Sequence, residues 1–147
     1  MKTVKTVLGE ISPEALGFTD IHNHVFKSGG MEVIEDKDFG IESIEKSHQE
    51  LLKFKAAGGN TMVDMQPLGV GRSINAMKEI VKDTGVNLIA ITGFHRSSLY
   101  DKAHFVHRYT TDQITDIIVS EVEKGIEVND FCGPIVQHSD AKPGLIK

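Results

Sequence analysis

The strongest constraint on the fold is a repeated alternation between short apolar runs and longer amphipathic stretches. Residues 61–65 and 86–92 are short and almost entirely apolar, which is typical of strands buried on both faces of a parallel sheet. Between such runs, apolar residues recur at helical spacing, and glycines stand where each helix should end. The order strand, helix, strand, helix, strand, helix, strand predicts a parallel α/β fold.

The pattern gives each expected element a range. Strands are expected at residues 18–25, 61–65, 86–92 and 144–147, after a short β element at 3–11. Helices are expected at residues 41–57, from the cap Ser73 to Gly85, and from a capping box at Thr110 and Gln113 to Gly125. Irregular loops are expected at residues 27–40, 93–109 and 130–144. By pattern alone, an open flavodoxin-like sheet and a partial barrel both fit.

Composition narrows the class of protein. The 147 residues suffice for one domain with a sizeable core, and a single cysteine excludes an internal disulfide. The net charge of -5 argues against a nucleic-acid partner, and no apolar run is long enough to span a bilayer. No secretory leader pattern is present, so we expect a cytoplasmic protein without membrane or nucleic-acid partners. A homo-oligomer is left open.

Two histidines, His22 and His24, stand at the end of the first main strand. Successive side chains on a strand point to opposite faces, so the two imidazoles should share one face and Asn23 should take the other. Two neighbouring imidazoles form half of a site for a divalent metal. From these residues alone, a polar pair without a metal is the alternative.

The loop after the third strand contains His95, Arg96 and Tyr100 close to the strand end. A guanidinium pairs well with phosphate or carboxylate, so we predict that these residues recognise an anionic or hydroxylated substrate. A solvated surface loop, or a contact between subunits, is the alternative.

Three other polar residues are expected to have structural roles. Asp64 ends an apolar strand, where a carboxylate needs hydrogen-bond partners. His48 falls on the apolar face of the helix at 41–57 and should pack there. Arg72 follows two glycines and is expected to clamp a loop in preference to touching substrate.

An ordered set of motifs resembles the phosphotriesterase family of the amidohydrolase superfamily. His22-Asn23-His24 is similar to the His-x-His signature of the superfamily. The other motifs follow in the family's order: Gly17-Phe18-Thr19, Gly59-Asn60-Thr61-Met62-Val63-Asp64, Gly69-Val70-Gly71-Arg72, Thr84-Gly85-Val86, Thr92-Gly93-Phe94, Gly125-Ile126 and Gly144-Leu145-Ile146-Lys147. The likeness covers essentially the whole chain, but only the first half of the family's domain.

The resemblance implies the first half of a TIM (β/α)8 barrel, with four parallel strands alternating with helices after a short β element. It also implies a centre of two divalent metal ions, zinc before manganese or cobalt. His22 and His24 would bind the more buried ion. Lys147 matches the family's catalytic lysine, which is carboxylated by carbon dioxide and bridges both ions. A neutral lysine can form such a carbamate, whereas an ammonium has no lone pair for a metal.

The rest of the family's ligand set, two histidines and an aspartate on later strands, is not in this sequence. We therefore expect residues 1–147 to be the N-terminal part of a single metal-dependent hydrolase barrel, reaching its fourth strand. Two positions depart from the family: Asn23 stands where Glu is frequent, and Ser73 stands where Asp commonly follows the Gly-x-Gly-Arg motif.

The activity implied by the resemblance is metal-dependent hydrolysis of an ester bond in a small molecule. The extra segment from Pro134 to Pro143, with the His-, Arg- and Tyr-rich third loop, resembles the branch that acts on lactones of phosphorylated sugars. A phosphotriesterase or arylesterase on the same site is the nearest alternative. A non-catalytic metal-binding barrel and a half-barrel that assembles as a dimer are alternatives of a different class.

Overall fold

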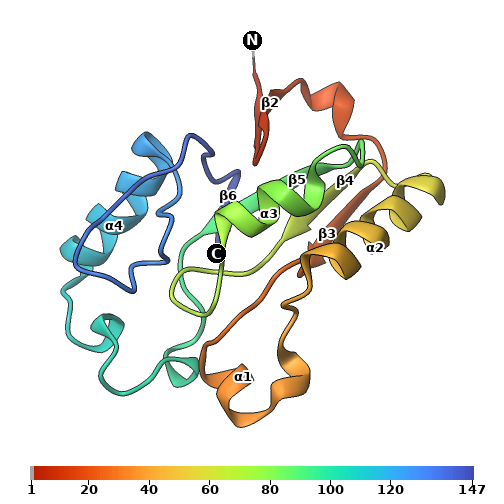
Figure 1. The fold of residues 1–147 in the computed structure, drawn as a ribbon. Helices are drawn as coiled ribbons and strands as arrows, with labels where there is room; N and C mark the ends of the chain where they lie inside the picture. The colour runs from red at the N-terminus through yellow and green to blue at the C-terminus, as the bar shows by residue number, and fades with distance from the viewer. Residues whose placement is uncertain (1) are drawn as a thin grey trace.

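Two sheets of different kinds form the framework, and the computed structural model describes residues 2–147 (Figure 1). A small antiparallel hairpin pairs β1 (Val4–Thr6) with β2 (Gly9–Ile11), which confirms the short β element. The main sheet is parallel and contains β3 (Thr19–Asn23), β4 (Thr61–Asp64), β5 (Asn87–Thr92) and β6 (Leu145–Ile146) in that spatial order. In the wall of a barrel, the strands lie side by side in the order in which they follow along the chain. A flavodoxin-like sheet instead reverses its strand order at a switch point. The four strands therefore form the half-barrel that the resemblance implied.

The three predicted helices are present and connect successive strands: α2 (Ile44–Ala56), α3 (Ile74–Val81) and α4 (Thr111–Lys124). Each begins after a side-chain cap, because Ser43, Ser73 and Thr110 accept hydrogen bonds from the backbone of the first turn. At α4 both bonds of the predicted capping box are formed. The helix α3 ends at Val81, earlier than predicted, because the chain turns through a positive φ of 61° at Asp83.

Short helical turns that the sequence did not reveal lie in the predicted loops and in the turn before β3. They are η1 (Pro13–Leu16), α1 (Met31–Glu35), η2 (Lys37–Phe39), η3 (Ser97–Leu99) and η4 (Phe105–His107). None is longer than 5 residues, which is too short for an apolar period to identify. The stretch from 130 to 144 is irregular, as predicted.

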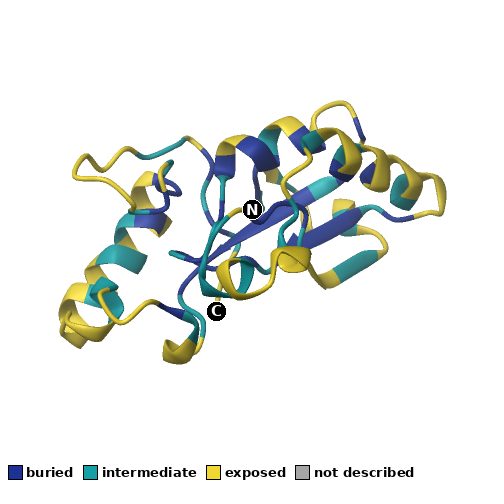
Figure 2. Ribbon diagram, turned by 60° about the horizontal axis from the view of Figure 1, so that its bottom comes forward, coloured by how far each residue is buried: buried dark blue, intermediate teal, exposed yellow. Residues whose placement is uncertain are grey.

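The core lies mainly between the sheet and the helices α2 and α3, where Figure 2 shows buried residues along the facing surfaces. Leu51, Met77, Ile80 and Leu88 are almost fully buried there. A smaller cluster on the other face of the sheet joins Val63, Ile89 and Ile91 to Val4, Leu16 and Met65. The N-terminal hairpin and η1 thus pack against the inner face of the half-barrel near the amino ends of its strands. The carboxyl ends are left for the loops that carry the candidate site.

The two outermost strands of the main sheet each have a neighbour on one side only. Large apolar side chains on or beside them are exposed, including Phe18 (71%), Ile21 (74%) and Ile146 (64%). Open edges with exposed apolar residues are surfaces that proteins normally cover. None of the helices within residues 2–147 combines the length and the apolarity that a bilayer crossing requires.

Candidate metal centre

The histidine pair lies at the carboxyl end of β3, where the strand has a bulge that includes His22. Asp20 is opposite Met62 and Asn23 is opposite Asp64, so two residues of β3 face one residue of β4. The rings of His22 and His24 nevertheless remain neighbours, with centroids 5.9 Å apart and an edge-to-face angle of 69°. The structure therefore brings the two predicted imidazoles together.

His24 combines a lowered pKa with a ring nitrogen that has no hydrogen-bond partner among the described residues. Burial lowers the pKa of His24, with the nearby positive charge of Lys147 as the next cause, so the neutral imidazole is favoured. Its Nδ1 atom is buried and has no hydrogen-bond partner among the described residues. A neutral imidazole with a free ring nitrogen is the form that binds a divalent metal.

Asp64 lies behind His24, with its Oδ1 atom 4.0 Å from the Nδ1 atom of His24. The carboxylate is fully buried and accepts hydrogen bonds of 2.8 Å from the backbone N–H groups of Val25 and Gln66. Burial raises the pKa of Asp64 to about 6. Its contacts agree with the predicted structural role, because Asp64 fixes the chain directly after the two histidines.

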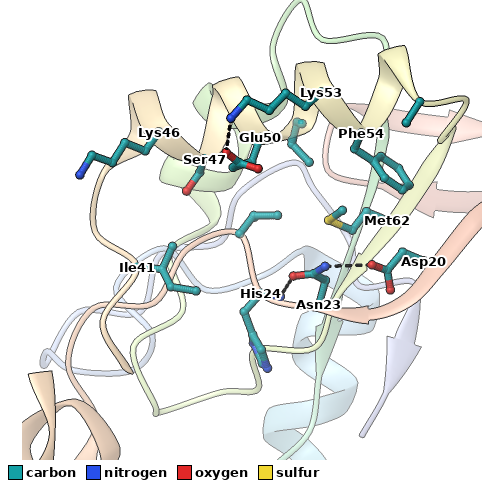
Figure 3. Close-up of a pocket in the computed structure, with 13 residues that line it drawn as sticks. Asp20, Asn23, His24, Ile41, Lys46, Ser47, Glu50, Lys53, Phe54 and Met62 are labelled. Carbon is teal, nitrogen blue, oxygen red and sulfur yellow. Dashed lines mark hydrogen bonds and ion pairs between the residues drawn. The ribbon is translucent and has the colours of Figure 1, made fainter. Parts of the chain in front are cut away.

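The side chain of Asn23 turns toward Asp20 and away from the ring of His24 (Figure 3). Its amide donates to Asp20 at 2.8 Å, and its carbonyl accepts from the backbone N–H of His24 at 2.8 Å (Figure 3). Beside these residues is a cavity of about 610 Å³, which lies between β3 and α2. The cavity follows the edge of β3 that has no neighbouring strand.

Lys147 reaches the same end of the sheet from the end of β6. Its backbone N–H donates to Thr92 at 2.9 Å, and its Nζ atom donates to the carbonyl of Met65 at 3.2 Å. Lys147 is exposed, but partial desolvation of its side chain lowers its pKa, in the direction of the neutral amine that carbamate formation requires. Because its charge acts on the pKa of His24, the two residues lie within electrostatic range of each other.

The described residues do not by themselves assemble a complete metal site. Within residues 2–147, no three side chains of His, Cys, Asp or Glu gather as a metal-binding cluster. A catalytic zinc usually has three protein ligands, so His22 and His24 with Lys147 are short of a complete binuclear set.

The three predicted substrate residues occupy different positions in the loop after β5. His95 is half-buried, and its pKa is lowered by burial and by the charge of Lys147, so the two residues lie within electrostatic range of each other. Arg96 is exposed. Tyr100 is only 5% exposed; its hydroxyl accepts from the N–H of His95 at 2.9 Å and donates to the carbonyl of Leu68 at 2.8 Å. Burial raises the pKa of Tyr100 to about 12, so this hydroxyl stays protonated.

The sequence interpretation missed an ion pair in the loop after β3. Lys27 is 7% exposed and pairs with Glu32, the second residue of α1. Both charges act on the pKa values of His24, His95 and Lys147, so this pair lies near the same end of the sheet. The one sequence signal was a lysine directly after an apolar pair, Val25 and Phe26, which gave no reason to expect burial.

Comparison with known proteins agrees with this arrangement. Residues 2–146 match the Phosphotriesterase family. A phospho-furanose lactonase of Mycoplasmopsis agalactiae is 39% identical over 99% of this chain and 42% of its own length. The structure of an amidohydrolase from Mycoplasma synoviae superposes with a TM-score of 0.92 at 41% identity, covering 99% of this chain and 42% of that one. A lactonase from Listeria monocytogenes superposes with a TM-score of 0.83 at 27% identity, over 99% of this chain and 46% of that one. The chain thus spans less than half the length of these proteins.

Proposed function

Because the chain belongs to the phosphotriesterase family, we propose that it is the N-terminal part of a metal-dependent hydrolase barrel that opens lactone rings. The observation that carries the proposal is that His22 and His24 are neighbours at the carboxyl end of β3, while Lys147 follows β6 at the same end of the sheet and its charge acts on the pKa of His24. Active sites in barrels of this architecture lie at those ends. A relative that is a phospho-furanose lactonase supports a phosphorylated sugar lactone as the substrate class.

The proposed cofactor is a pair of divalent metal ions, zinc before manganese or cobalt. His22 and His24 would hold one ion, and the unpartnered ring nitrogen of His24 fits that role. Lys147, once carboxylated, would offer its carbamate oxygens to both ions; partial desolvation of the side chain favours the neutral amine that reacts with carbon dioxide. When bound, such ions acidify a water molecule and polarise the substrate carbonyl. The remaining ligands come from outside residues 2–147.

The other residues bind and orient the substrate in this proposal. His95, within electrostatic range of Lys147, and the exposed Arg96 contact the anionic or hydroxylated part of the lactone. The hydroxyl of Tyr100 is already bonded to His95 and Leu68, so Tyr100 acts on the substrate by holding His95 in place. A small-molecule partner and a cytoplasmic location complete the proposal, in keeping with the net charge of -5 and the single cysteine.

Metal removal and substrate comparison test the proposed function on the complete protein. Treatment with a strong chelator should abolish lactone hydrolysis, and zinc, manganese or cobalt should restore it. A phosphorylated sugar lactone should be preferred over a phosphotriester or an aryl ester by about 100-fold in kcat/KM. Hydrolysis that survives metal removal would rule the proposal out. Preference for the phosphotriester would favour the nearest alternative, and less than about one bound ion per chain would favour a non-catalytic barrel.

A further inference from the structure

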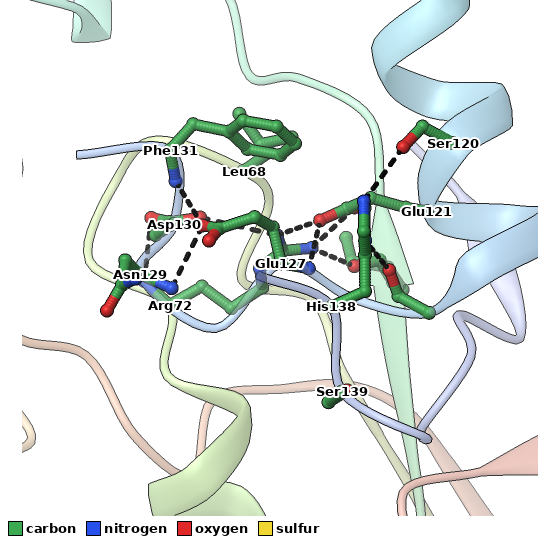
Figure 4. Close-up of polar contacts among 12 residues, drawn as sticks. Leu68, Arg72, Ser120, Glu121, Glu127, Asn129, Asp130, Phe131, His138 and Ser139 are labelled. Atoms are coloured by element: carbon green, nitrogen blue, oxygen red, sulfur yellow. Dashed lines mark hydrogen bonds and ion pairs between the residues drawn. The ribbon is translucent and has the colours of Figure 1, made fainter. Parts of the chain in front are cut away.

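A buried ion-pair network connects the loop after β4 with α4 (Figure 4). The side chains of Arg72 and Glu121 are both fully buried. Two parallel hydrogen bonds join them: Nη1 of Arg72 to Oε2 of Glu121 at 3.0 Å, and Nη2 to Oε1 at 2.6 Å. Asp130 lies 3.3 Å from the same guanidinium. Paired bonds of this kind fix orientation as well as distance.

The guanidinium of Arg72 also holds the end of β5. Its Nη1 atom donates to the carbonyl of Ile91 at 2.9 Å. Ile91 pairs with Leu145 of β6, two residues before Lys147. One side chain therefore joins the loop after β4, the carboxyl end of β5 and the helix α4.

The same network shapes the irregular segment of residues 125–144, which leads from α4 to β6. Glu121 accepts from the backbone N–H of Glu127 at 2.9 Å. The carboxylate of Glu127 accepts in turn from Asn129 at 2.9 Å and from Phe131 at 2.6 Å. Asp130 adopts a positive φ of 52° and accepts from the backbone N–H of Arg72 at 3.3 Å. The segment that delivers Lys147 is thus tied back to Arg72.

The loop that Arg72 anchors, residues 65–72, is bonded to each of the other site loops. Met65 accepts from the Nζ atom of Lys147, and Leu68 accepts from the hydroxyl of Tyr100. The backbone N–H of Leu68 donates to Gly93 at 3.1 Å. The carbonyl of Gly71 accepts from Ser28, in the loop after the histidines, at 3.0 Å. A shift of residues 65–72 would therefore weaken the hydrogen bonds that position all of these loops.

We propose that Arg72 is a positioning residue of the metal centre: by holding residues 65–72 and Ile91, it fixes Lys147 and the loop of His95 relative to the histidine pair. This proposal rests on the proposed function. Groups that orient metal ligands and substrate contribute to affinity and rate without touching either. A residue that only stabilised the fold would change the unfolding midpoint and leave the assembled site as it was.

The first test variant removes both members of the Arg72–Glu121 pair, while Asp130, the third charge of the network, keeps its bonds from the backbone N–H groups of Gly71 and Arg72. In Arg72→Met with Glu121→Gln, both charges are lost and the glutamine can still accept from the N–H of Glu127. Replacing both members of a buried pair is far less damaging than replacing one. Arg72→Lys is a second variant, which keeps the charge and loses the paired bonds. Lys78→Met is the matched control, because Lys78 also pairs with the segment 125–144, through exposed Asp140, but makes no bond to residues 65–72.

Two measurements on the complete protein separate positioning from simple stability. Amide hydrogen exchange at Leu68, His95 and Lys147 should rise by about tenfold or more in both Arg72 variants, relative to amides of the core strand β5. Metal affinity should fall by about 10- to 100-fold, with kcat reduced more than KM. The Lys78 control should match the wild type in both.

The outcomes distinguish this inference from the proposed function. Wild-type exchange and metal affinity in a folded Arg72 variant would overturn the inference, even if lactone hydrolysis by the wild type upholds the function. Faster exchange at the three amides in a protein that hydrolyses no lactone would overturn the proposed function and still support Arg72 as the residue that positions the loops.

Discussion

The Nζ atom of Lys147 donates a hydrogen bond of 3.2 Å to the backbone carbonyl of Met65, which lies 82 residues earlier in the chain. Met65 follows β4 and packs in the inner cluster of the half-barrel. The bond therefore directs Lys147 across the end of β5 toward the inside of the curved sheet. It also explains why this lysine acts on the pKa values of His24 and His95.

Replacing Lys147 by Met should remove the proposed bridge between the metal ions. We expect the metal content per chain to fall by at least about half, and lactone hydrolysis to fall by more than about 100-fold. Elemental analysis and steady-state kinetics on the complete protein are the measurements. Lys142→Met is a matched control. Lys142 is half-buried in the same segment, and its charge lowers the pKa of Glu10 in the N-terminal hairpin. Full metal content in the Lys147 variant would contradict the assignment.

Replacing either His22 or His24 by Ala should release metal without unfolding the protein, because His22 is exposed and His24 only partly buried. Activity should fall by more than about 100-fold, beyond what changes at outer positions of a metal site cost. His48→Ala is the control: its Nδ1 atom lies 2.8 Å from the carbonyl of Ile80, a packing contact far from the pair in sequence. That control should retain its metal. Equal metal loss in all three variants would argue against a specific histidine site.

Tyr100→Phe should destabilise the protein by about 1–3 kcal/mol, because the carbonyl of Leu68 and the N–H of His95 lose a buried partner. Urea unfolding measures this cost. Tyr109 is 47% exposed, and Tyr109→Phe should change stability by no more than about 0.5 kcal/mol. If Tyr100→Phe left stability unchanged and raised only KM, Tyr100 would instead be a direct substrate contact.

Gly93→Ala should disturb Lys147 directly. Gly93 has a φ of +97°, and a Cβ atom there would stand 2.3 Å from the carbonyl oxygen of Lys147. We expect a loss of more than about 1 kcal/mol in the free energy of unfolding, together with reduced metal binding. Gly133 has no heavy atom within 4 Å of such a Cβ, so Gly133→Ala should be nearly neutral. Matching unfolding midpoints and metal contents for the two variants would refute the close approach.

The stability of the protein should depend on pH through Asp130. Burial raises the pKa of Asp130 from 3.8 to about 6, so between these values the folded protein holds a proton that the unfolded chain has released. The contribution of Asp130 to the free energy of unfolding therefore decreases by roughly 1–3 kcal/mol as the pH rises from about 4 to about 6. Above that range it no longer changes with pH.

Asp130→Asn isolates this contribution, because Asn tolerates the positive φ of this position and does not titrate. Chemical denaturation from pH 4 to pH 7 should show a smaller decline in the variant than in the wild type. Other carboxyl groups affect both proteins alike, so the comparison is between the two slopes. Parallel curves would show that Asp130 does not take up a proton on folding.

Much of the fold could be predicted from local patterns. The strand and helix order, the capping box at Thr110 and the short β element are confirmed, because each depends on residues close together in the chain. The bulge in β3 was not predicted, because bulges depend on the register against β4. The short turns η3 and α1 lack an apolar period, so the sequence indicated only loops there.

The candidate site was predicted in part for the same reason. His22 and His24 are two positions apart in sequence, so their rings stay neighbours even though a bulge interrupts the alternation of the strand. Tyr100 does not lie on the surface of its loop. Its ring is buried, and its hydroxyl joins two loops. The pair of Lys27 and Glu32 was missed, because a lysine after the apolar pair Val25 and Phe26 gave no reason to expect its burial.

By itself, the sequence determined the alternating elements, the histidine pair and the likeness to the phosphotriesterase family. These depend on periodicity, on caps and on residue order, all of which are local properties of the chain. Only the tertiary structure decided that Lys147 turns toward Met65, and that Arg72 joins Ile91, Glu121 and Asp130. Such contacts join residues about 20 to 80 positions apart, and their energy comes from desolvation and hydrogen-bond geometry that exist only once the segments are packed together.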